Sequence, residues 1–184
     1  MMENKVSPFK PALNNGIILG IVSIFISVII WIAGLMESMG FAGSFYILMF
    51  NLTITVVLLV VFTKSYRDNF LDRKITFGKA FVFAFLVVIV SVILSAIYNY
   101  IFNTFIDPDY VQRLMLSMQD KTVAMLENSG AGDEAIDAML AKFEEQGIPS
   151  VLKQVQQALI GGIVGGAFMA LISSAIIKKD NTEA

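Results

Sequence analysis

The chain has 184 residues, of which 57% are hydrophobic and only 15% are charged, a balance unlike that of a soluble domain and typical of a membrane protein. Cysteine and histidine are both absent, which removes the usual residues of disulfides, thiolate nucleophiles, haem ligation, zinc sites and histidine acid–base catalysis. The net charge of -2 says little by itself, because its meaning depends on which side of a membrane each charge lies.

Four segments are apolar enough and long enough to cross a bilayer, whose hydrocarbon layer of about 30 Å requires roughly 20 helical residues. In chain order these spans one to four are Asn15 to Met36, Ser44 to Thr63, Lys79 to Ile106, and Gln156 to Ile177. We therefore expect an all-α, polytopic membrane protein with four transmembrane helices.

The basic residues predict how the spans are oriented. Lys and Arg gather in the N-terminal tail, between spans two and three, and at the C-terminus, whereas the loop between spans one and two has none. Because cytoplasmic loops are enriched in Lys and Arg, we expect both termini in the cytoplasm and the acidic region 107–155 outside. The basic residues between spans two and three are Lys64, Arg67, Arg73, Lys74 and Lys79.

The region between spans three and four has the pattern of a helical hairpin. From Tyr110 onward, apolar residues recur at the spacing of an amphipathic helix. The stretch NSGAG at 128–132 ends this helix, a second helix starts near Asp133, and Gly147 ends the second one. Because spans three and four both exceed the bilayer thickness, we expect them to carry the hairpin as a short stalk. The chain thus divides into 1–106 (tail and spans one to three), 107–155 (extracytoplasmic hairpin) and 156–184 (span four and tail).

The joint between span three and the hairpin has the sequence Asp107-Pro108-Asp109. Proline disfavours a helical conformation in the residue before it, so we expect Asp107 to end span three. We also expect Asp107 to cap the next helix, with Pro108 in its first turn and Asp109 near the positive end of its dipole. The two carboxylates are therefore interpreted as a helix joint and not as a catalytic pair.

Three longer stretches carry a resemblance to a known family. They are KITFGKAF at 74–81, IYNYIFNTFIDPDYV at 97–111 and GIPSVLKQVQQALIGGIVGG at 147–166. In order and spacing they resemble the bacterial membrane proteins of domain-of-unknown-function family 4199, and the resemblance covers nearly the whole chain. It implies a small integral protein of the bacterial plasma (inner) membrane. It implies no catalytic residues, because the family has no established activity.

Small residues recur every four positions along span four, in two overlapping GxxxG patterns. In lipid such a stripe lets another helix approach closely. The partner is either a helix of the same chain, with span one and its Gly16 and Gly20 as the candidate, or a second copy of the chain. The predicted helix-packing residues are Ala158, Gly161, Gly162, Gly165, Gly166, Ala170 and Ser174.

Ser91, Ser95, Asn99 and Asn103 lie four residues apart in span three, so they project from one face of the helix. One interpretation is a wall of a polar path for a solute, and the other, which we favour, is hydrogen bonding between helices. No Asp, Glu, Lys or Arg lies in the middle of a span, which disfavours an ion-coupled transporter but leaves a passive pore built from several copies.

Our leading hypothesis from the sequence is a non-enzymatic interaction or assembly protein. It would pack through span four, as a homo-oligomer or within one chain, and present the 107–155 hairpin to an envelope protein. The alternative is a subunit of an oligomeric channel or transport system, with the Ser/Asn line of span three facing the path. We expect no enzyme, because no nucleophile and base pair can be named. We expect no metal or other cofactor, since the outer carboxylates lack the spacing of a calcium loop. The expected partners include membrane lipid but no nucleic acid.

Overall fold

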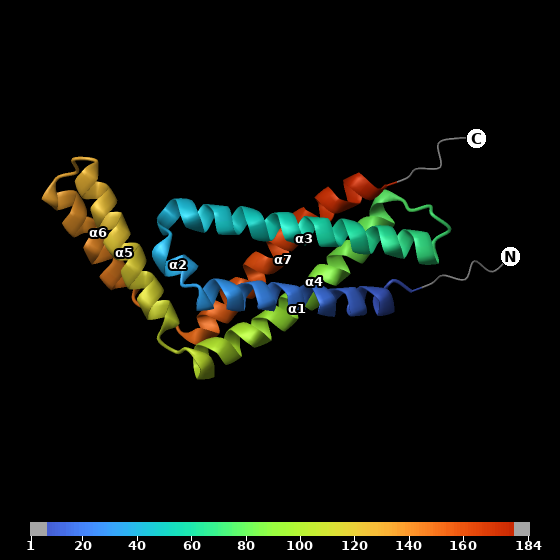
Figure 1. Ribbon diagram of the computed structural model, residues 1–184, viewed down its shortest axis with the longest axis horizontal. Helices are drawn as coiled ribbons and strands as arrows, with labels where there is room; N and C mark the ends of the chain where they lie inside the picture. Colours follow the sequence, from blue (N-terminus) through green and yellow to red (C-terminus); the bar gives the residue numbers. More distant parts are fainter. Residues whose placement is uncertain (1–6, 179–184) are drawn as a thin grey trace.

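The computed structural model describes residues 7–178, and every element in that part of the chain is a helix. Four long helices are connected by a short helix, a π-helical turn and the two helices of the hairpin (Figure 1). The elements are α1 (Phe9–Ile32), α2 (Leu35–Ser38), α3 (Gly40–Phe70), α4 (Phe77–Ile101), the π-helical turn η1 (Phe102–Ile106), α5 (Tyr110–Asn128), α6 (Asp133–Gln146) and α7 (Val151–Ile177).

Four helices are long and apolar enough to cross a membrane, which confirms the predicted all-α chain with four candidate spans. They cover Phe9–Ile32, Gly43–Phe70, Phe77–Ile106 and Val151–Ile177. The helices extend beyond most of the predicted limits, because hydrophobicity marks the part that lies in lipid and not the point where backbone hydrogen bonding stops.

The end of the first span differs from the prediction. The helix α1 ends at Ile32, and Gly34 follows with a φ of 59°, a left-handed conformation that glycine adopts without strain. The Gly34 N–H donates to the carbonyl of Trp31 at 3.0 Å, so the turn uses a carbonyl that the helix leaves free. The prediction of one continuous span to Met36 is therefore wrong, since Met36 belongs to the separate helix α2.

The central helix of the bundle is α4. It packs against α1 and against α7, whereas α3 packs mainly against α7. In Figure 1, α1 begins and α7 ends at the end of the bundle that also holds the loop from α3 to α4. The hairpin of α5 and α6 lies at the opposite end. These are called the terminal end and the hairpin end below.

The tightest packing lies in the half of the bundle toward the terminal end. Phe83 and Val87 of α4, Leu59 of α3 and Ala170 of α7 are completely buried. The ring of Tyr66 from α3 stacks on the ring of Phe83, with centroids 4.2 Å apart and planes 3° from parallel. This half of the bundle is therefore closed by interlocking side chains.

Arg67 is buried near the terminal end of α3, although the sequence analysis placed it in a basic loop. Its Nε donates to Oδ1 of Asp68 at 2.7 Å, and its Nη1 donates to the carbonyl of Ile177 at 3.4 Å. Ile177 is the last residue of α7, so the guanidinium meets the negative end of that helix. The connecting loop is shorter than predicted and spans only 71–76.

The hairpin is present between η1 and α7 in the chain, and it is also contacted by α2. The helix α5 contacts α2 as well as α6 and rises past the end of α3 (Figure 1). No residue of α5 is buried, so the hairpin helices share only a thin interface. Span length alone did not reveal the contact between α2 and α5, and the stalk formed by spans three and four stays a prediction.

Candidate functional site

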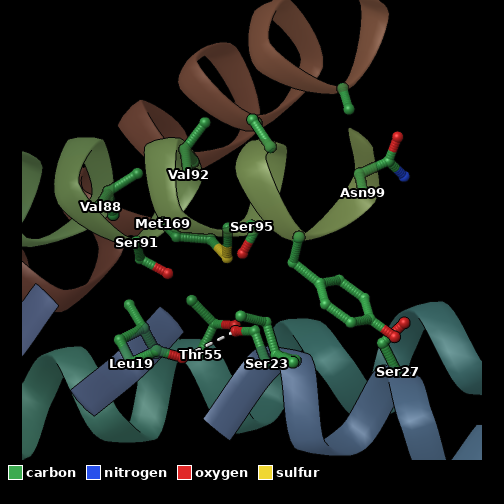
Figure 2. A pocket seen from close by; sticks show the side chains of 15 residues that line it. Leu19, Ser23, Ser27, Thr55, Val88, Ser91, Val92, Ser95, Asn99 and Met169 are labelled. Carbon is green, nitrogen blue, oxygen red and sulfur yellow. Dashed lines mark hydrogen bonds between the residues drawn. The ribbon is translucent and has the colours of Figure 1, made fainter. Parts of the chain in front are cut away.

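The predicted polar line lies on α4 and η1, and its side chains meet the interior of the bundle. Ser91 and Asn103 are buried, with 6% and 4% of their surfaces exposed, and Ser95 and Asn99 are partly buried. Figure 2 shows the hydroxyls of Ser91 and Ser95 pointing from α4 toward α1, where they approach Ser23. The line is therefore not a lipid-facing feature.

Two neighbouring cavities follow this line. The inner cavity, of about 320 Å³, lies among α1, α3, α4 and α7 and is lined by Ser91, Ser95 and Asn99. The outer cavity, of about 430 Å³, is lined by Asn99 and Asn103 and continues to side chains of α2 and α5. Because the cavities share part of their walls, we treat them as one polar cleft. The shared residues are Ser23, Ser27, Tyr98 and Asn99.

The polar cleft contains buried acceptors without donors. Oδ1 of Asn99 and Oδ1 of Asn103 are buried and have no hydrogen-bond partner within residues 7–178. Nδ2 of Asn103 donates to the carbonyl of Asn99 at 2.9 Å. The amide oxygen of Asn103 is left without a hydrogen-bond donor. A buried acceptor left unpaired costs about 1–3 kcal/mol. A donor supplied by water or by a ligand in the cleft would remove this cost.

The inner end of the polar cleft is closed. Leu19, Val88 and Met169 line the cavity there, and Leu19 and Val88 are themselves 2% and 3% exposed. Beyond them, toward the terminal end, lies the packed core around Phe83 and Leu59. The cleft therefore occupies only the half of the bundle toward the hairpin, and it is not a pore through the four helices.

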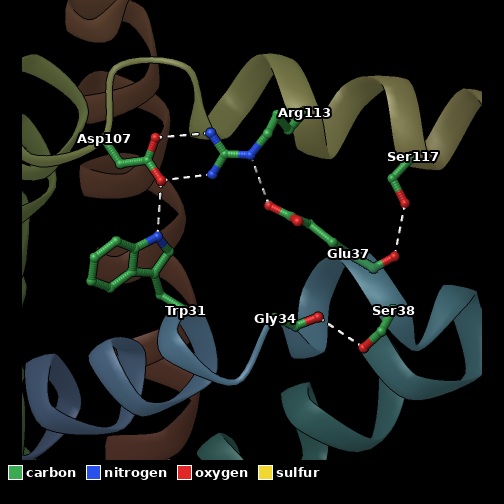
Figure 3. Close-up of polar contacts among 7 residues, drawn as sticks. All are labelled: Trp31, Gly34, Glu37, Ser38, Asp107, Arg113 and Ser117. Atoms are coloured by element: carbon green, nitrogen blue, oxygen red, sulfur yellow. Dashed lines mark hydrogen bonds and ion pairs between the residues drawn. The ribbon is translucent and has the colours of Figure 1, made fainter.

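A cluster of polar contacts joins α1, the residues before α5, and α5 itself (Figure 3). Nη1 and Nη2 of Arg113 donate to the two oxygens of Asp107 at 3.0 and 2.7 Å, a bidentate ion pair. Nε1 of Trp31 donates to Oδ2 of the same carboxylate at 2.9 Å. The bonds from Arg113 hold the pKa of Asp107 below its usual range, against the opposing effect of partial desolvation.

The same cluster ties α5 to α2 through Glu37. Nε of Arg113 lies 3.4 Å from Oε1 of Glu37, and the hydroxyl of Ser117 donates to the Glu37 carbonyl at 2.9 Å. The ammonium group of Lys121 donates to that carbonyl as well. We call Trp31, Glu37, Asp107, Arg113 and Ser117 the joint cluster. Because Trp31 also lines the outer cavity, the joint cluster lies at the hairpin end of the polar cleft.

The joint has the predicted place but not the predicted cap. The helix α5 begins at Tyr110, directly after Asp107-Pro108-Asp109, so Pro108 precedes the helix and does not lie in its first turn. The N-cap residue is Asp109, and its side chain makes no capping hydrogen bond. The expected cap at Asp107 is wrong, because Arg113 and Trp31 take its carboxylate.

The glycines of α7 face two directions. A Cβ added to Gly162 would lie 3.0 Å from a methyl group of Val92, and one added to Gly166 would lie 2.1 Å from a methyl group of Val88. Both valines belong to α4, so the helix that approaches this face is α4 and not α1.

The other face of α7 has no close neighbour in the described part of the chain. Apart from the adjacent residues and the nearby backbone of α7 itself, no described atom lies within 4 Å of the Cβ positions of Gly161 and Gly165. Of the remaining predicted packing residues, Ala170 and Ser174 are buried, whereas Ala158 is exposed at the wall of the inner cavity.

Sequence reasoning missed the main partners in the joint cluster. Trp31 is the only tryptophan, and Glu37 is the only acidic residue between spans one and two, so both were visible as isolated polar features. Their pairing with Asp107 and Arg113 joins positions 76 residues apart, which a single sequence does not reveal. Within the described range 7–178, no three Asp or Glu side chains gather into a group that could hold a metal ion.

Comparisons with known proteins place most of the chain in one family model. The model is described as "Protein of unknown function (DUF4199)", and it matches residues 14–179. No curated protein and no solved structure matches the chain.

Proposed function

The chain belongs to the DUF4199 family of proteins of unknown function, and we propose that it is a non-enzymatic membrane protein that binds a polar group in the polar cleft. The observation that carries this proposal is the pair of unpartnered amide oxygens of Asn99 and Asn103 beside the two cavities. Such acceptors are costly in an apolar interior unless water or a ligand supplies donors. This function agrees with the alternative of a transport subunit better than with a purely structural role.

The shape of the polar cleft supports one-sided access. Its walls include side chains from α2 and α5 at the hairpin end, whereas Leu19, Val88 and Met169 close it toward the terminal end. A single chain in this form is a binding site and not an open channel. Transport would require the packed half around Phe83 to open, or a path at an interface between copies.

We further propose that the cleft opens to the outside of a bacterial plasma membrane. The support is the distribution of the 13 Lys and Arg residues, all but four of which lie on the side of the two termini. The four exceptions, Arg113, Lys121, Lys142 and Lys153, lie in the acidic region 107–155. The hairpin would then be extracytoplasmic and both termini cytoplasmic.

Single cysteines test the proposed cleft. Because the chain has no native cysteine, each of Ser95 and Asn99 can be replaced alone and treated with a water-soluble thiol reagent in membranes. Ile93 and Ile97 are matched controls on the same helix, since both side chains face outward with 50% and 53% of their surface exposed. The thiolate that reacts forms only where water reaches the sulfur. We expect modification at Ser95 and Asn99 to be at least tenfold faster than at Ile93 and Ile97. Equal protection at all four positions would refute the proposal.

A second candidate function is self-association through the outward face of α7. It is favoured by the open space over Gly161 and Gly165, whose spacing permits close contact with a helix of a second copy. The hairpin would then be available to an envelope protein. Replacing Gly161 and Gly165 by Leu should convert an oligomer into a monomer in mild detergent. A monomeric wild-type protein, or an unchanged oligomer in the double variant, would remove this candidate.

A further inference from the structure

Several polar side chains of the cleft donate a hydrogen bond to a backbone carbonyl. The hydroxyl of Ser23 donates to the carbonyl of Leu19 at 2.9 Å, and the hydroxyl of Thr55 donates to the carbonyl of Asn51 at 2.8 Å. The amide nitrogen of Asn51 donates to the carbonyl of Ile47 at 2.9 Å. The two hydroxyl oxygens can then only accept a further bond, whereas the Asn51 amide keeps its oxygen as an acceptor and one N–H as a donor.

The same pattern holds at the outer cavity. Nε2 of Gln154 donates to the carbonyl of Pro149 at 2.8 Å, and Nδ2 of Asn103 donates to the carbonyl of Asn99. The amide oxygens of Asn99 and Asn103 remain buried and unpaired. Asn103 is itself 4% exposed, so it is a buried polar side chain in the wall of a cavity with one acceptor unmet. The polar cleft thus offers several acceptors to a ligand, and the amides and serine hydroxyls in its walls also offer donors.

The absence of charged side chains from the described lining of the cleft restricts the class of ligand further. Neither cavity is lined by Asp, Glu, Lys or Arg within residues 7–178. The acidic groups of the joint cluster at the hairpin end of the cleft, Asp107 and Glu37, are already paired with Arg113. A cationic ligand would find no free counter-charge and an anionic ligand no cation, and either charge would be costly in this interior.

From this combination we propose that the polar cleft recognises a neutral group with several hydroxyls, each of which can both donate and accept a hydrogen bond. Such a group has two sources, namely the glycerol or sugar end of a neutral lipid and a free polyol. This inference rests on the proposed binding function and adds the chemical class of the ligand. Apolar side chains such as Ile24 and Val92 lie in the same wall as the acceptors, which suits a hydroxylated group attached to an apolar chain.

The single tryptophan provides the readout. Trp31 lines the outer cavity, so its fluorescence should respond when the cleft is occupied. We would titrate the full chain, in phosphatidylcholine nanodiscs, with 1-monooleoylglycerol. The matched probe is methyl oleate, which has the same acyl chain and no hydroxyl donor. Free glycerol in a separate titration distinguishes a soluble polyol from a lipid.

We expect a saturable change with 1-monooleoylglycerol or with glycerol, and none with methyl oleate. Replacing the Asn103 amide by an apolar side chain of similar size, in Asn103→Leu, should weaken the dissociation constant about tenfold, because one buried acceptor is lost. Ser95→Ala is a second variant of smaller volume, expected to weaken binding in the same direction. Ile97→Leu on the outer face should leave binding unchanged.

Stability separates recognition from a folding defect. Asn103→Leu removes an unpaired buried acceptor, so its thermal midpoint without ligand should not fall below that of the wild type. Equal responses to 1-monooleoylglycerol and methyl oleate, or no saturable response to either hydroxylated probe, would overturn the ligand class. If Ser95→Cys still reacts with water-soluble reagents in that case, the proposed cleft survives without this ligand. If Ser95→Cys is protected, the proposed function itself has failed.

Discussion

The contact between α4 and α7 yields a quantitative prediction, because Gly166 and Gly165 are neighbours with opposite surroundings. A Cβ at position 166 would lie 2.1 Å from Cγ1 and 3.3 Å from Cβ of Val88, whereas nothing lies within 4 Å of a Cβ at position 165. Carbon atoms pack at about 3.5–4.0 Å, so Gly166→Ala requires α4 and α7 to separate by about 1 Å or more. Rotating the stiff Val88 side chain would not relieve the contact with its Cβ.

Overpacking of this kind costs about 1–3 kcal/mol, whereas replacing a helical glycine by alanine where the Cβ meets open space gains up to about 1 kcal/mol. Gly166→Ala should therefore be less stable than Gly165→Ala by about 2 kcal/mol. The assay is reversible unfolding in mixed detergent, followed by circular dichroism under conditions that keep the chain monomeric. Adding Val88→Ala to Gly166→Ala should recover part of the loss through a favourable coupling energy of about 1 kcal/mol. Equal stabilities of the two alanine variants would refute the close approach of α7 to α4.

The joint cluster and the terminal end supply three further predictions. Asp107→Asn should weaken the bidentate pair with Arg113 and loosen α5 from α2, seen as faster backbone hydrogen exchange in α5 with unchanged exchange in α4. Since the pKa of Asp107 is lowered in the folded state, its stabilising effect is present above the usual value of about 3.9 and is lost as the pH falls through the lowered value. The fluorescence of Trp31, which bonds to this carboxylate, should change in that acidic range in the wild type but not in Asp107→Asn. Arg67→Met should destabilise the terminal end by about 1–3 kcal/mol in unfolding experiments, because the carbonyl of Ile177 loses its charged donor, and no loss of stability would contradict this role.

The four candidate spans and the hairpin were predictable because each rests on a local pattern. A run of about 20 apolar residues and the spacing of Ser91, Ser95 and Asn99 both follow from helix geometry alone. The polar line could therefore be assigned to one face of one helix. What that face meets could not be assigned, because the opposite wall comes from Ser23 of α1 and Thr55 of α3, whose distance from α4 depends on how the helices pack.

The errors also have local physical causes. Asp107 has the residue type and position of a helix cap, but a guanidinium six residues later and an indole 76 residues earlier bind its carboxylate more strongly than backbone amides would. Arg67 was interpreted as a signal for topology, although three-dimensional packing buries it against the end of α7. The stripe of small residues in α7 indicated close packing but could not show that Gly166 faces α4 while Gly165 faces outward.

The most direct test of a polar cleft open at the hairpin end is the modification rate of Asn99→Cys in sealed vesicles, measured with a membrane-impermeant thiol reagent applied to one side at a time. We predict rapid modification of Asn99→Cys from the side of the hairpin, slow modification from the side of the termini, and slow modification of Ile97→Cys from either side. Protection of Asn99→Cys from both sides, or modification mainly from the side of the termini, would contradict a polar cleft that is open at the hairpin end and closed by the core around Phe83.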